Sequence, residues 1–265
     1  DTKLGRMGSP YAGNSLVDID PSIATFDKKS TALEQFEELT KKIHLKGGKL
    51  FIDLVINHTG WGSQLFENHP EFFVRQNDGE FMSPGAWGTV WEDLVALNHE
   101  QKEQVQMIAE AFLTWCRRGV DGFRCDAGYQ VPLPVWRYIT AKVLKEFPDT
   151  IFFLEGLGGA VEATASILKE GGMQWAYSEL FQNESNQQLF AYPQFSESMS
   201  QSLGCFVHFS ETHDNNRLAS KGKDWSIFRN KLCAALSANG AFGFTTGAEW
   251  LANEKIQVHN KSGLR

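Results

Sequence analysis

Short apolar runs alternate with longer amphipathic stretches along most of this 265-residue chain. Helix-like stretches, such as residues 30–44 and 100–118, separate runs that have the length of buried strands. Repeated strand–helix–strand units predict a parallel sheet covered by helices. The strand-like runs are residues 49–56, 119–126, 150–155, 173–179, 205–214 and 241–247.

This alternation predicts an α/β fold of the (β/α)8 barrel, or TIM barrel, type. The runs number two fewer than the strands of a full barrel, so we expect an incomplete barrel that lacks its first two strands. An open doubly wound sheet has the same alternation and is the alternative at this point. Residues 59–98 interrupt the rhythm with a polar, Gly- and Trp-bearing segment that is too irregular for one helix.

Composition narrows the classes of partner. The formal net charge of −7 argues against nucleic acid or an anionic membrane. No apolar run reaches the roughly 18 residues of a membrane-spanning helix. The 8 Trp and 20 Phe exceed what packing needs, and such a surplus can line a groove for flat, ring-shaped ligands. The chain begins with Asp1 rather than Met, so we expect its true N-terminus to be missing.

The cysteines are widely spaced and form no CxxC pair. Cys116, Cys125, Cys205 and Cys233 each lie in an apolar helix or strand pattern, which predicts buried free thiols rather than disulfides. Free thiols favour a cytoplasmic location.

Polar side chains gather at the carboxyl ends of the predicted strands, where the working residues of such barrels lie. Random surface placement would scatter them, so the sequence predicts a functional site at this edge of the sheet. The residues, in strand order, are Asp53, Asn57 and His58, then Arg124 and Asp126, then Glu155, then Glu179, and finally His213 and Asp214.

Two neighbouring strands carry a pattern that suits acid–base chemistry. Arg124 and Asp126 share one strand face, and because a buried ion costs several kcal/mol unless it is paired, Arg124 should hold Asp126 ionised. Adjacent parallel strands lie about 4.8 Å apart, which brings Asp126 near Glu155. Retaining glycosidases need two carboxyl groups ~5–5.5 Å apart. The apolar residues before Glu155 favour its protonated form, so the pair predicts a nucleophile and a proton donor.

Simpler interpretations stay open at this point. An Arg–Asp pair on one strand is also a common structural ion pair, and Asp53 at a strand end is more often a loop anchor. Glu179 has no evident partner, so we expect a structural or rim residue. His58 and His213 are singly more typical of hydrogen-bond donors than of metal ligands. Together with Asp53 and Asp214, however, they would suit a divalent metal in an unrelated barrel enzyme.

Four short segments appear in order along the chain: DLVINH (53–58), GFRCD (122–126), FFLEG (152–156) and ETHDN (211–215). They resemble the four short motifs of the alpha-amylase superfamily, glycoside hydrolase family 13, and the likeness covers nearly the whole chain. The resemblance implies a catalytic barrel formed by residues 1–58 and 99–265, with residues 59–98 as a short domain B after the third strand. It also implies that the C-terminal β-domain is missing.

The resemblance assigns roles to individual residues. Asp126 would be the nucleophile that forms a covalent glycosyl-enzyme, Glu155 the general acid/base, and Asp214 the residue that stabilises the distorted sugar. Tyr11 would replace a stacking Tyr that is common where Leu16 and Val17 stand here. The remaining roles are substrate binding by His58, Arg124, His213 and Tyr11, and support by Asp53 and Asn57.

One departure from the family concerns calcium. The family often has a Lys–His pair shortly after the nucleophile, and the His carbonyl binds calcium. Tyr129 and Gln130 occupy those positions here. We therefore expect no required cofactor, with Asn57 as the one candidate calcium ligand.

The implied function is a retaining glycosidase that acts on α-glucosidic bonds of starch- or glycogen-type glucans, with an α-glucan or maltooligosaccharide as partner. The alternative is a transglycosylase of the same family, a maltosyltransferase or glucanotransferase. Residues 132–156 and 234–244 resemble the maltosyltransferases that use maltose-1-phosphate. A third hypothesis is an inactive glucan-binding barrel.

Overall fold

The computed structural model describes residues 8–260, and its main feature is a 6-stranded parallel sheet. The neighbours in the sheet follow one another in chain order, without the reversal that marks a doubly wound sheet. The predicted partial barrel is thus confirmed, and the doubly wound alternative is wrong. The strands are β1 (Phe51–Asp53), β6 (Gly122–Cys125), β7 (Ile151–Leu154), β8 (Trp175–Tyr177), β9 (Cys205–His208) and β10 (Ala241–Phe242).

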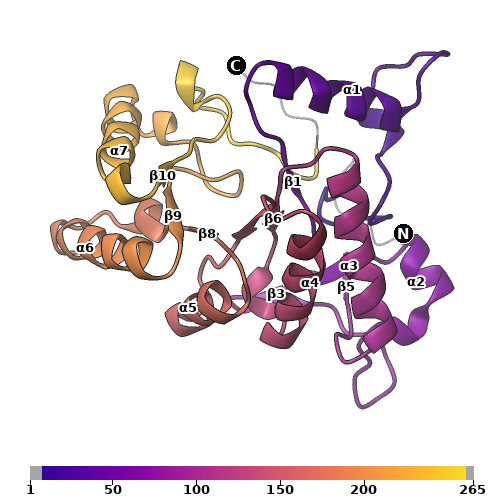
Figure 1. Ribbon diagram of the computed structural model, residues 1–265. Coiled ribbons are helices and arrows are strands. Elements are labelled where there is room, and N and C mark those ends of the chain that lie inside the picture. Colours follow the sequence, from indigo (N-terminus) through magenta and orange to yellow (C-terminus); the bar gives the residue numbers. More distant parts are fainter. Residues whose placement is uncertain (1–7, 261–265) are drawn as a thin grey trace.

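Helices follow the strands around the outer side of the sheet (Figure 1). α1 starts at a capping box, in which Thr31 accepts from the Glu34 amide and Glu34 accepts from the Thr31 amide. The helices are α1 (Ala32–Leu45), α3 (Lys102–Arg117), α4 (Leu133–Glu146), α5 (Val161–Glu170), α6 (Asn186–Ser202) and α7 (Lys223–Ala235). Short 3-10 turns are η1 (Pro21–Ile23), η2 (Pro70–Phe72), η3 (Gly128–Gln130), η4 (Glu179–Gln182), η5 (Leu218–Ser220), η6 (Ser237–Asn239) and η7 (Ala248–Trp250).

The observed strands are shorter than the predicted apolar runs. β1 ends at Asp53, although the run continues to residue 56. Leu54 and Ile56 belong to the buried core instead, because the chain leaves the sheet and His58 begins a different strand pairing. An apolar run in the sequence indicates which residues are buried, and residues beyond the last hydrogen bond of a strand can be buried as well.

The segment between β1 and α3 forms its own small elements. β2 (His58–Gly60) pairs antiparallel with β5 (Leu94–Ala96), and β3 (Gly85–Ala86) pairs antiparallel with β4 (Thr89–Val90). Along the chain, α2 (Gln64–Asn68) lies between β2 and β3. The β3–β4 hairpin reaches the carboxyl edge of the main sheet, where it lines the cavity described below.

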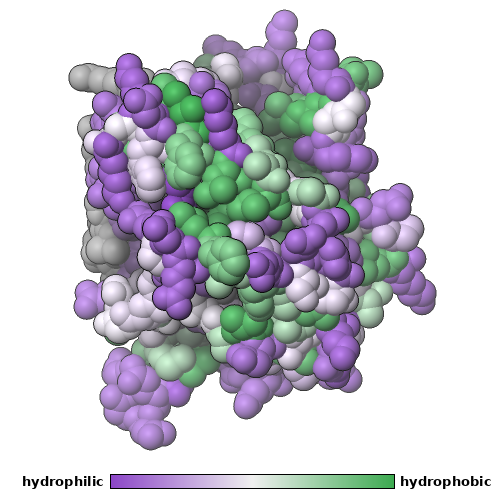
Figure 2. All heavy atoms as spheres, turned by 90° about the vertical axis from the view of Figure 1, so that its left-hand side faces the viewer, coloured by the Kyte–Doolittle hydropathy of each residue, from purple (hydrophilic) through white to green (hydrophobic). Residues whose placement is uncertain are grey.

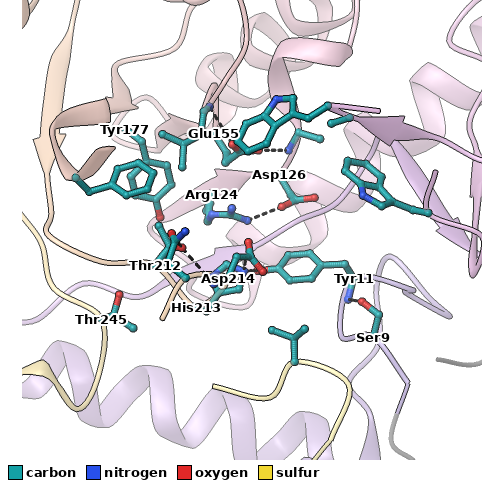
Figure 3. Close-up of a pocket in the computed structure, with 18 of the residues that line it drawn as sticks. Ser9, Tyr11, Arg124, Asp126, Glu155, Tyr177, Thr212, His213, Asp214 and Thr245 are labelled. Atoms are coloured by element: carbon teal, nitrogen blue, oxygen red, sulfur yellow. Dashed lines mark hydrogen bonds and ion pairs between the residues drawn. The ribbon is translucent and has the colours of Figure 1, made fainter. Parts of the chain in front are cut away.

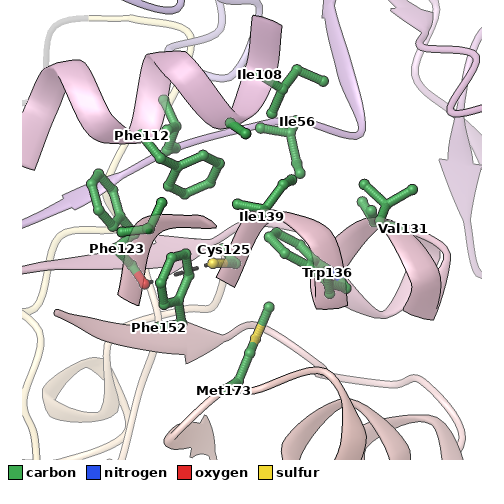
Figure 4. Packing of buried hydrophobic residues seen from close by; sticks show 14 of the residues in the cluster. Ile56, Ile108, Phe112, Phe123, Cys125, Val131, Trp136, Ile139, Phe152 and Met173 are labelled. Carbon is green, nitrogen blue, oxygen red and sulfur yellow. Dashed lines mark hydrogen bonds between the residues drawn. The ribbon is translucent and has the colours of Figure 1, made fainter. Parts of the chain in front are cut away.

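The main core lies between the sheet and its helices. Phe123 of β6 and Phe152 of β7 pack against Phe112 of α3, with ring centroids 4.7 and 5.5 Å from that of Phe112 (Figure 4). Because side chains alternate along a strand, Arg124 and Phe153 point to the opposite face. The sheet therefore has an apolar outer face and an inner face that carries charge.

We expect Phe152→Ala to lower the free energy of unfolding by about 3–5 kcal/mol, because the deleted ring leaves a cavity among fully buried neighbours. Urea denaturation followed by tryptophan fluorescence measures this. The matched control is Phe26→Ala, since Phe26 is 87% exposed. A loss below about 1 kcal/mol at Phe152 would contradict the placement of the core.

Hydrophobic side chains also reach the surface. Figure 2 shows a group of them across the face that α6 and α7 occupy in Figure 1. Exposed members on α6, α7 and β10 include Phe190, Phe228 and Phe242. Among residues 8–260, no helix is long and apolar enough to cross a membrane.

All four cysteines are free, as predicted. Cys116, Cys125 and Cys233 are buried, and Cys205 is half-buried. Burial raises the thiol pKa of Cys116 and Cys233 to about 11, so these thiols stay protonated at neutral pH.

Candidate active site

A cavity of about 970 Å³ lies at the carboxyl ends of the strands. Asp126 follows β6, Glu155 follows β7, and Asp214 lies in the loop after β9; all three line this one cavity (Figure 3). Its volume suits a ligand of several sugar rings. The sheet thus brings the three predicted carboxyl groups together from separate parts of the chain.

Arg124 joins two of the acidic side chains. Its Nη1 donates to Asp126 Oδ1 at 2.7 Å and to Asp53 Oδ2 at 2.6 Å. All three groups are at least partly shielded from solvent, so the charge-assisted bonds are strong. Burial raises the pKa of Asp53 to about 6, although the Arg124 guanidinium opposes that rise. The arrangement fixes one oxygen of Asp126 and leaves its carboxyl facing the cavity.

Glu155 is buried at the foot of the cavity and is held by backbone donors. Its Oε2 accepts from the Ala127 amide at 2.8 Å, and its Oε1 accepts from the Leu157 amide at 2.9 Å. Ala127 itself has a left-handed backbone with φ of 46°. Burial, and then the Asp126 charge, raise the pKa of Glu155 to about 7. A carboxyl group with this pKa can give and take a proton near neutral pH.

Tyr11 connects the Arg124 cluster to the loop that carries Asp214. Its hydroxyl donates to Asp53 Oδ2 at 3.2 Å and lies 3.0 Å from His213 Nε2. A hydroxyl has one hydrogen, so with that donation made it accepts from His213. The two rings also stack, with centroids 5.5 Å apart. Tyr11 therefore positions His213, whose Nε2 lies 3.3 Å from Asp214 Oδ2.

Asp214 differs from the other two carboxyl groups in exposure. Its side chain is 70% exposed, whereas that of Asp126 is 14% exposed. An exposed carboxylate on a cavity wall is free to accept hydrogen bonds from ligand hydroxyl groups. His213 gives it one neighbour and leaves room for others.

His58 presents an unsatisfied nitrogen inside the protein. The side chain is buried, its Nδ1 lies 3.3 Å from the Asn57 amide nitrogen, and its Nε2 has no hydrogen-bond partner. Burial lowers the pKa of His58 to about 4, so the ring is neutral at pH 7. Because a buried polar atom without a partner is costly, this nitrogen is suited to a ligand hydroxyl in the cavity that it lines.

The loop with His213 and Asp214 is held by a buried ion pair that the sequence alone does not predict. Glu211 Oε1 lies 2.9 Å from Arg217 Nε, and Glu211 Oε2 accepts from the Leu218 amide at 2.6 Å. Both charged side chains are almost fully buried. Pairing six residues apart in an irregular loop has no periodic signature, so only the fold reveals it.

Aromatic rings supply much of the remaining cavity wall, as the surplus of Trp and Phe suggested. They come from the β3–β4 hairpin, from the ends of β7 and β8, and from the loops beyond. The rings are Trp87, Trp91, Phe153, Tyr177, Phe181, Phe209 and Phe244. The sequence does not predict which rings line the cavity, because no local pattern distinguishes an aromatic residue of a cavity wall from one of the core.

Glu179 does have a partner, which corrects the expectation that none was evident. Its Oε1 accepts from the Gly158 amide at 2.8 Å. The interpretation as a structural or rim residue fits this contact, since Glu179 holds the loop that follows Glu155.

The calcium ligand set implied by the resemblance does not fit these residues. The Asn57 amide donates to Gln130 Oε1 at 3.0 Å, and Gln130 Nε2 donates to the Gly85 carbonyl at 3.2 Å. Gln130 thus links Asn57, directly before β2, to Gly85 of β3, and these neutral amides supply no negative charge for a cation. Within residues 8–260, no group of three or more His, Cys, Asp or Glu side chains could hold a metal ion.

Fold and site together define the class: a partial (β/α)8 barrel with an acidic cavity at the carboxyl ends of its strands. The alpha-amylase catalytic domain family matches residues 23–188. The chain belongs to this family, glycoside hydrolase family 13.

Solved structures and curated relatives agree with this placement. An alpha-amylase from Lactobacillus plantarum superposes with a TM-score of 0.79 at 25% identity, over 97% of this chain and 63% of that one. An alpha-amylase from Geobacillus thermoleovorans, complexed with acarbose, gives 0.76 at 18% identity, over 98% and 61%. An alpha-1,4-glucan:maltose-1-phosphate maltosyltransferase from Picrophilus torridus is 24% identical over 85% of this chain and 36% of its own length. The chain thus spans about a third of that relative.

Proposed function

We propose that the chain forms the catalytic centre of a retaining transglycosylase of the maltosyltransferase kind, which transfers α-maltosyl units from a donor such as maltose-1-phosphate to an α-glucan. Several relatives that are maltosyltransferases support transfer over hydrolysis, among them proteins from Picrophilus torridus and Cereibacter sphaeroides, each 24% identical. The observation that carries the proposal is the meeting of Asp126, Glu155 and Asp214 around one cavity.

In the first step, an Asp126 oxygen attacks the anomeric carbon, and the bond to the leaving group breaks. Arg124 Nη1, which donates to Asp126 Oδ1 at 2.7 Å, holds the carboxylate in place for the attack. Protonated Glu155 gives its proton to the leaving oxygen. Asp214 and the free Nε2 of His58 bind sugar hydroxyl groups, and Tyr11 orients His213 beside them.

In the second step, ionised Glu155 takes a proton from the incoming hydroxyl group, whose oxygen attacks the same carbon and releases Asp126. The stereochemistry of the donor bond is retained because two inversions cancel. A sugar hydroxyl gives transfer and water gives hydrolysis. Hydrolysis is the second candidate, and the likeness to the Lactobacillus plantarum alpha-amylase favours it.

Product analysis of the full-length protein separates these functions. We expect incubation with maltoheptaose and maltose-1-phosphate to give longer chains, detected by mass spectrometry, without an equal gain in reducing ends. A gain of reducing ends without lengthening would establish the hydrolase instead. Binding of maltoheptaose with no turnover of either donor would contradict both and indicate a glucan-binding barrel.

We further propose that activity does not depend on calcium, because Gln130 already joins Asn57, directly before β2, to Gly85 of β3. We expect dialysis against EDTA to leave the transfer rate within about twofold and the melting temperature within ~2 °C. Differential scanning calorimetry and the product assay check this. A loss of activity that added calcium restores would overturn the proposal.

A further inference from the structure

We propose that Trp87 is a stacking platform for the acceptor sugar, and that its ring favours a glucan over water in the second step. This inference rests on the proposed function and adds a specificity-determining residue to it. Trp87 lies outside the catalytic carboxyl cluster, at the tip of the β3–β4 hairpin, and lines the same cavity.

The backbone of the hairpin tip is unusual for a tryptophan. Ala86 pairs with Thr89, so Trp87 and Gly88 form a two-residue turn, and their φ angles are 55° and 77°. Such a turn prefers Asn, Asp or Gly at the first position, because a side chain is strained at positive φ. The ring gains little burial in return, since Trp87 is 72% exposed. Neither turn preference nor core packing therefore accounts for a tryptophan here.

The loop that follows Glu155 packs against one edge of the indole, at Cζ2, Cε2 and Nε1. A Cβ atom on Gly158 would lie only 2.0 Å from the Trp87 ring, so only glycine allows this approach. Gly158 has a φ of 75°, and its amide donates to Glu179 Oε1 at 2.8 Å. The Glu179 carboxylate thus holds the loop on which one side of the indole packs, and leaves the rest of the ring to the cavity.

This position matches the path of an incoming sugar. Glu155 must contact the oxygen that leaves in the first step and the oxygen that attacks in the second, so the acceptor enters beside it. Trp87 packs on Gly158, three residues after Glu155. The faces of a glucose ring carry C–H groups that stack well on an indole, whereas water gains nothing from an aromatic surface.

Binding and product ratio test the inference separately from the chemistry. In an Asp126→Asn background, which removes turnover, we expect Trp87→Ala to weaken maltoheptaose binding about tenfold by calorimetry, the loss of one stacked ring. With Asp126 intact, we expect the same change to raise the acceptor KM about tenfold and to lower the ratio of transfer to hydrolysis.

Two further variants give the controls. Trp250→Ala removes a tryptophan that is 56% exposed but lies outside the cavity lining, and should leave the maltoheptaose Kd within twofold. Trp87→Phe keeps an aromatic ring and should retain most of the affinity. Equal Kd values for Trp87→Ala and Trp250→Ala would overturn the inference even if the protein is an active transglycosylase. Conversely, a ring-dependent Kd in a protein without turnover would uphold the platform and reject the proposed reaction.

Discussion

Asp126→Asn is expected to lower kcat/KM for maltooligosaccharides by at least about 10⁴-fold, equivalent to roughly 5.5 kcal/mol of transition-state stabilisation. An amide is a poor nucleophile, and it cannot carry the negative charge that Arg124 Nη1 now pairs at 2.7 Å. Steady-state kinetics on maltoheptaose measure the effect, with circular dichroism to verify the fold.

The control for this change is Asp149→Asn, an Asp-to-Asn replacement at an exposed position away from the cavity. It should leave kcat/KM within about twofold. If Asp126→Asn loses less than about tenfold, Asp126 does not form a covalent intermediate, and the ion pair with Arg124 is structural.

Glu155→Gln is expected to lower kcat/KM for maltoheptaose by about 10²–10⁴-fold, the usual contribution of a general acid. The loss should be much smaller for the glycosylation step with α-maltosyl fluoride, because fluoride leaves without a proton. Stopped-flow measurement of fluoride release gives the loss with α-maltosyl fluoride, and steady-state kinetics give the loss with maltoheptaose. Equal losses with both donors would show that Glu155 is not the proton donor.

Glu155 is also expected to set how kcat/KM falls at alkaline pH. Burial raises the pKa of Glu155 to about 7, and the first step needs its protonated form, so kcat/KM should fall about tenfold per pH unit above that value. Below this pKa Glu155 is already protonated, so a further fall in pH should not raise kcat/KM through this group. Glu155→Gln should abolish the fall between pH 7 and 9, while an unchanged profile would assign the limb to another group.

Much of the fold could be predicted because its determinants are local. The α1 and α3 helices, Ala32–Leu45 and Lys102–Arg117, end within two residues of the predicted stretches 30–44 and 100–118, and the main sheet contains each predicted strand in chain order. The strand ends were less well predicted, as β1 illustrates, because apolar side chains are buried both inside and beyond the ladder. The periodicity of strands and helices can be seen in the sequence, whereas the residue at which a strand ends depends on the strands that pair with it.

The candidate site also contains residues that the sequence could predict and residues that it could not. The carboxyl groups could be named because parallel strands place their carboxyl ends together, so position in the chain gives position in space. Trp87 and the Glu211–Arg217 pair could not be named, since a hairpin or loop reaches the cavity through tertiary packing. The roles of Asp126, Glu155 and Asp214 remain predictions that kinetics must test.

The central claim is that Asp126 attacks the sugar, and trapping of the intermediate tests it directly. Incubation of the full-length protein with a fluorinated maltosyl fluoride, which slows the second step, should label one carboxylate. Trypsin cuts after Arg124 and Arg137, and in the peptide of residues 125–137 Asp126 is the only acidic side chain. We predict one sugar adduct on this peptide by mass spectrometry, absent in Asp126→Asn. An adduct on a peptide that carries Glu155 or Asp214, with residues 125–137 unlabelled, would contradict the account.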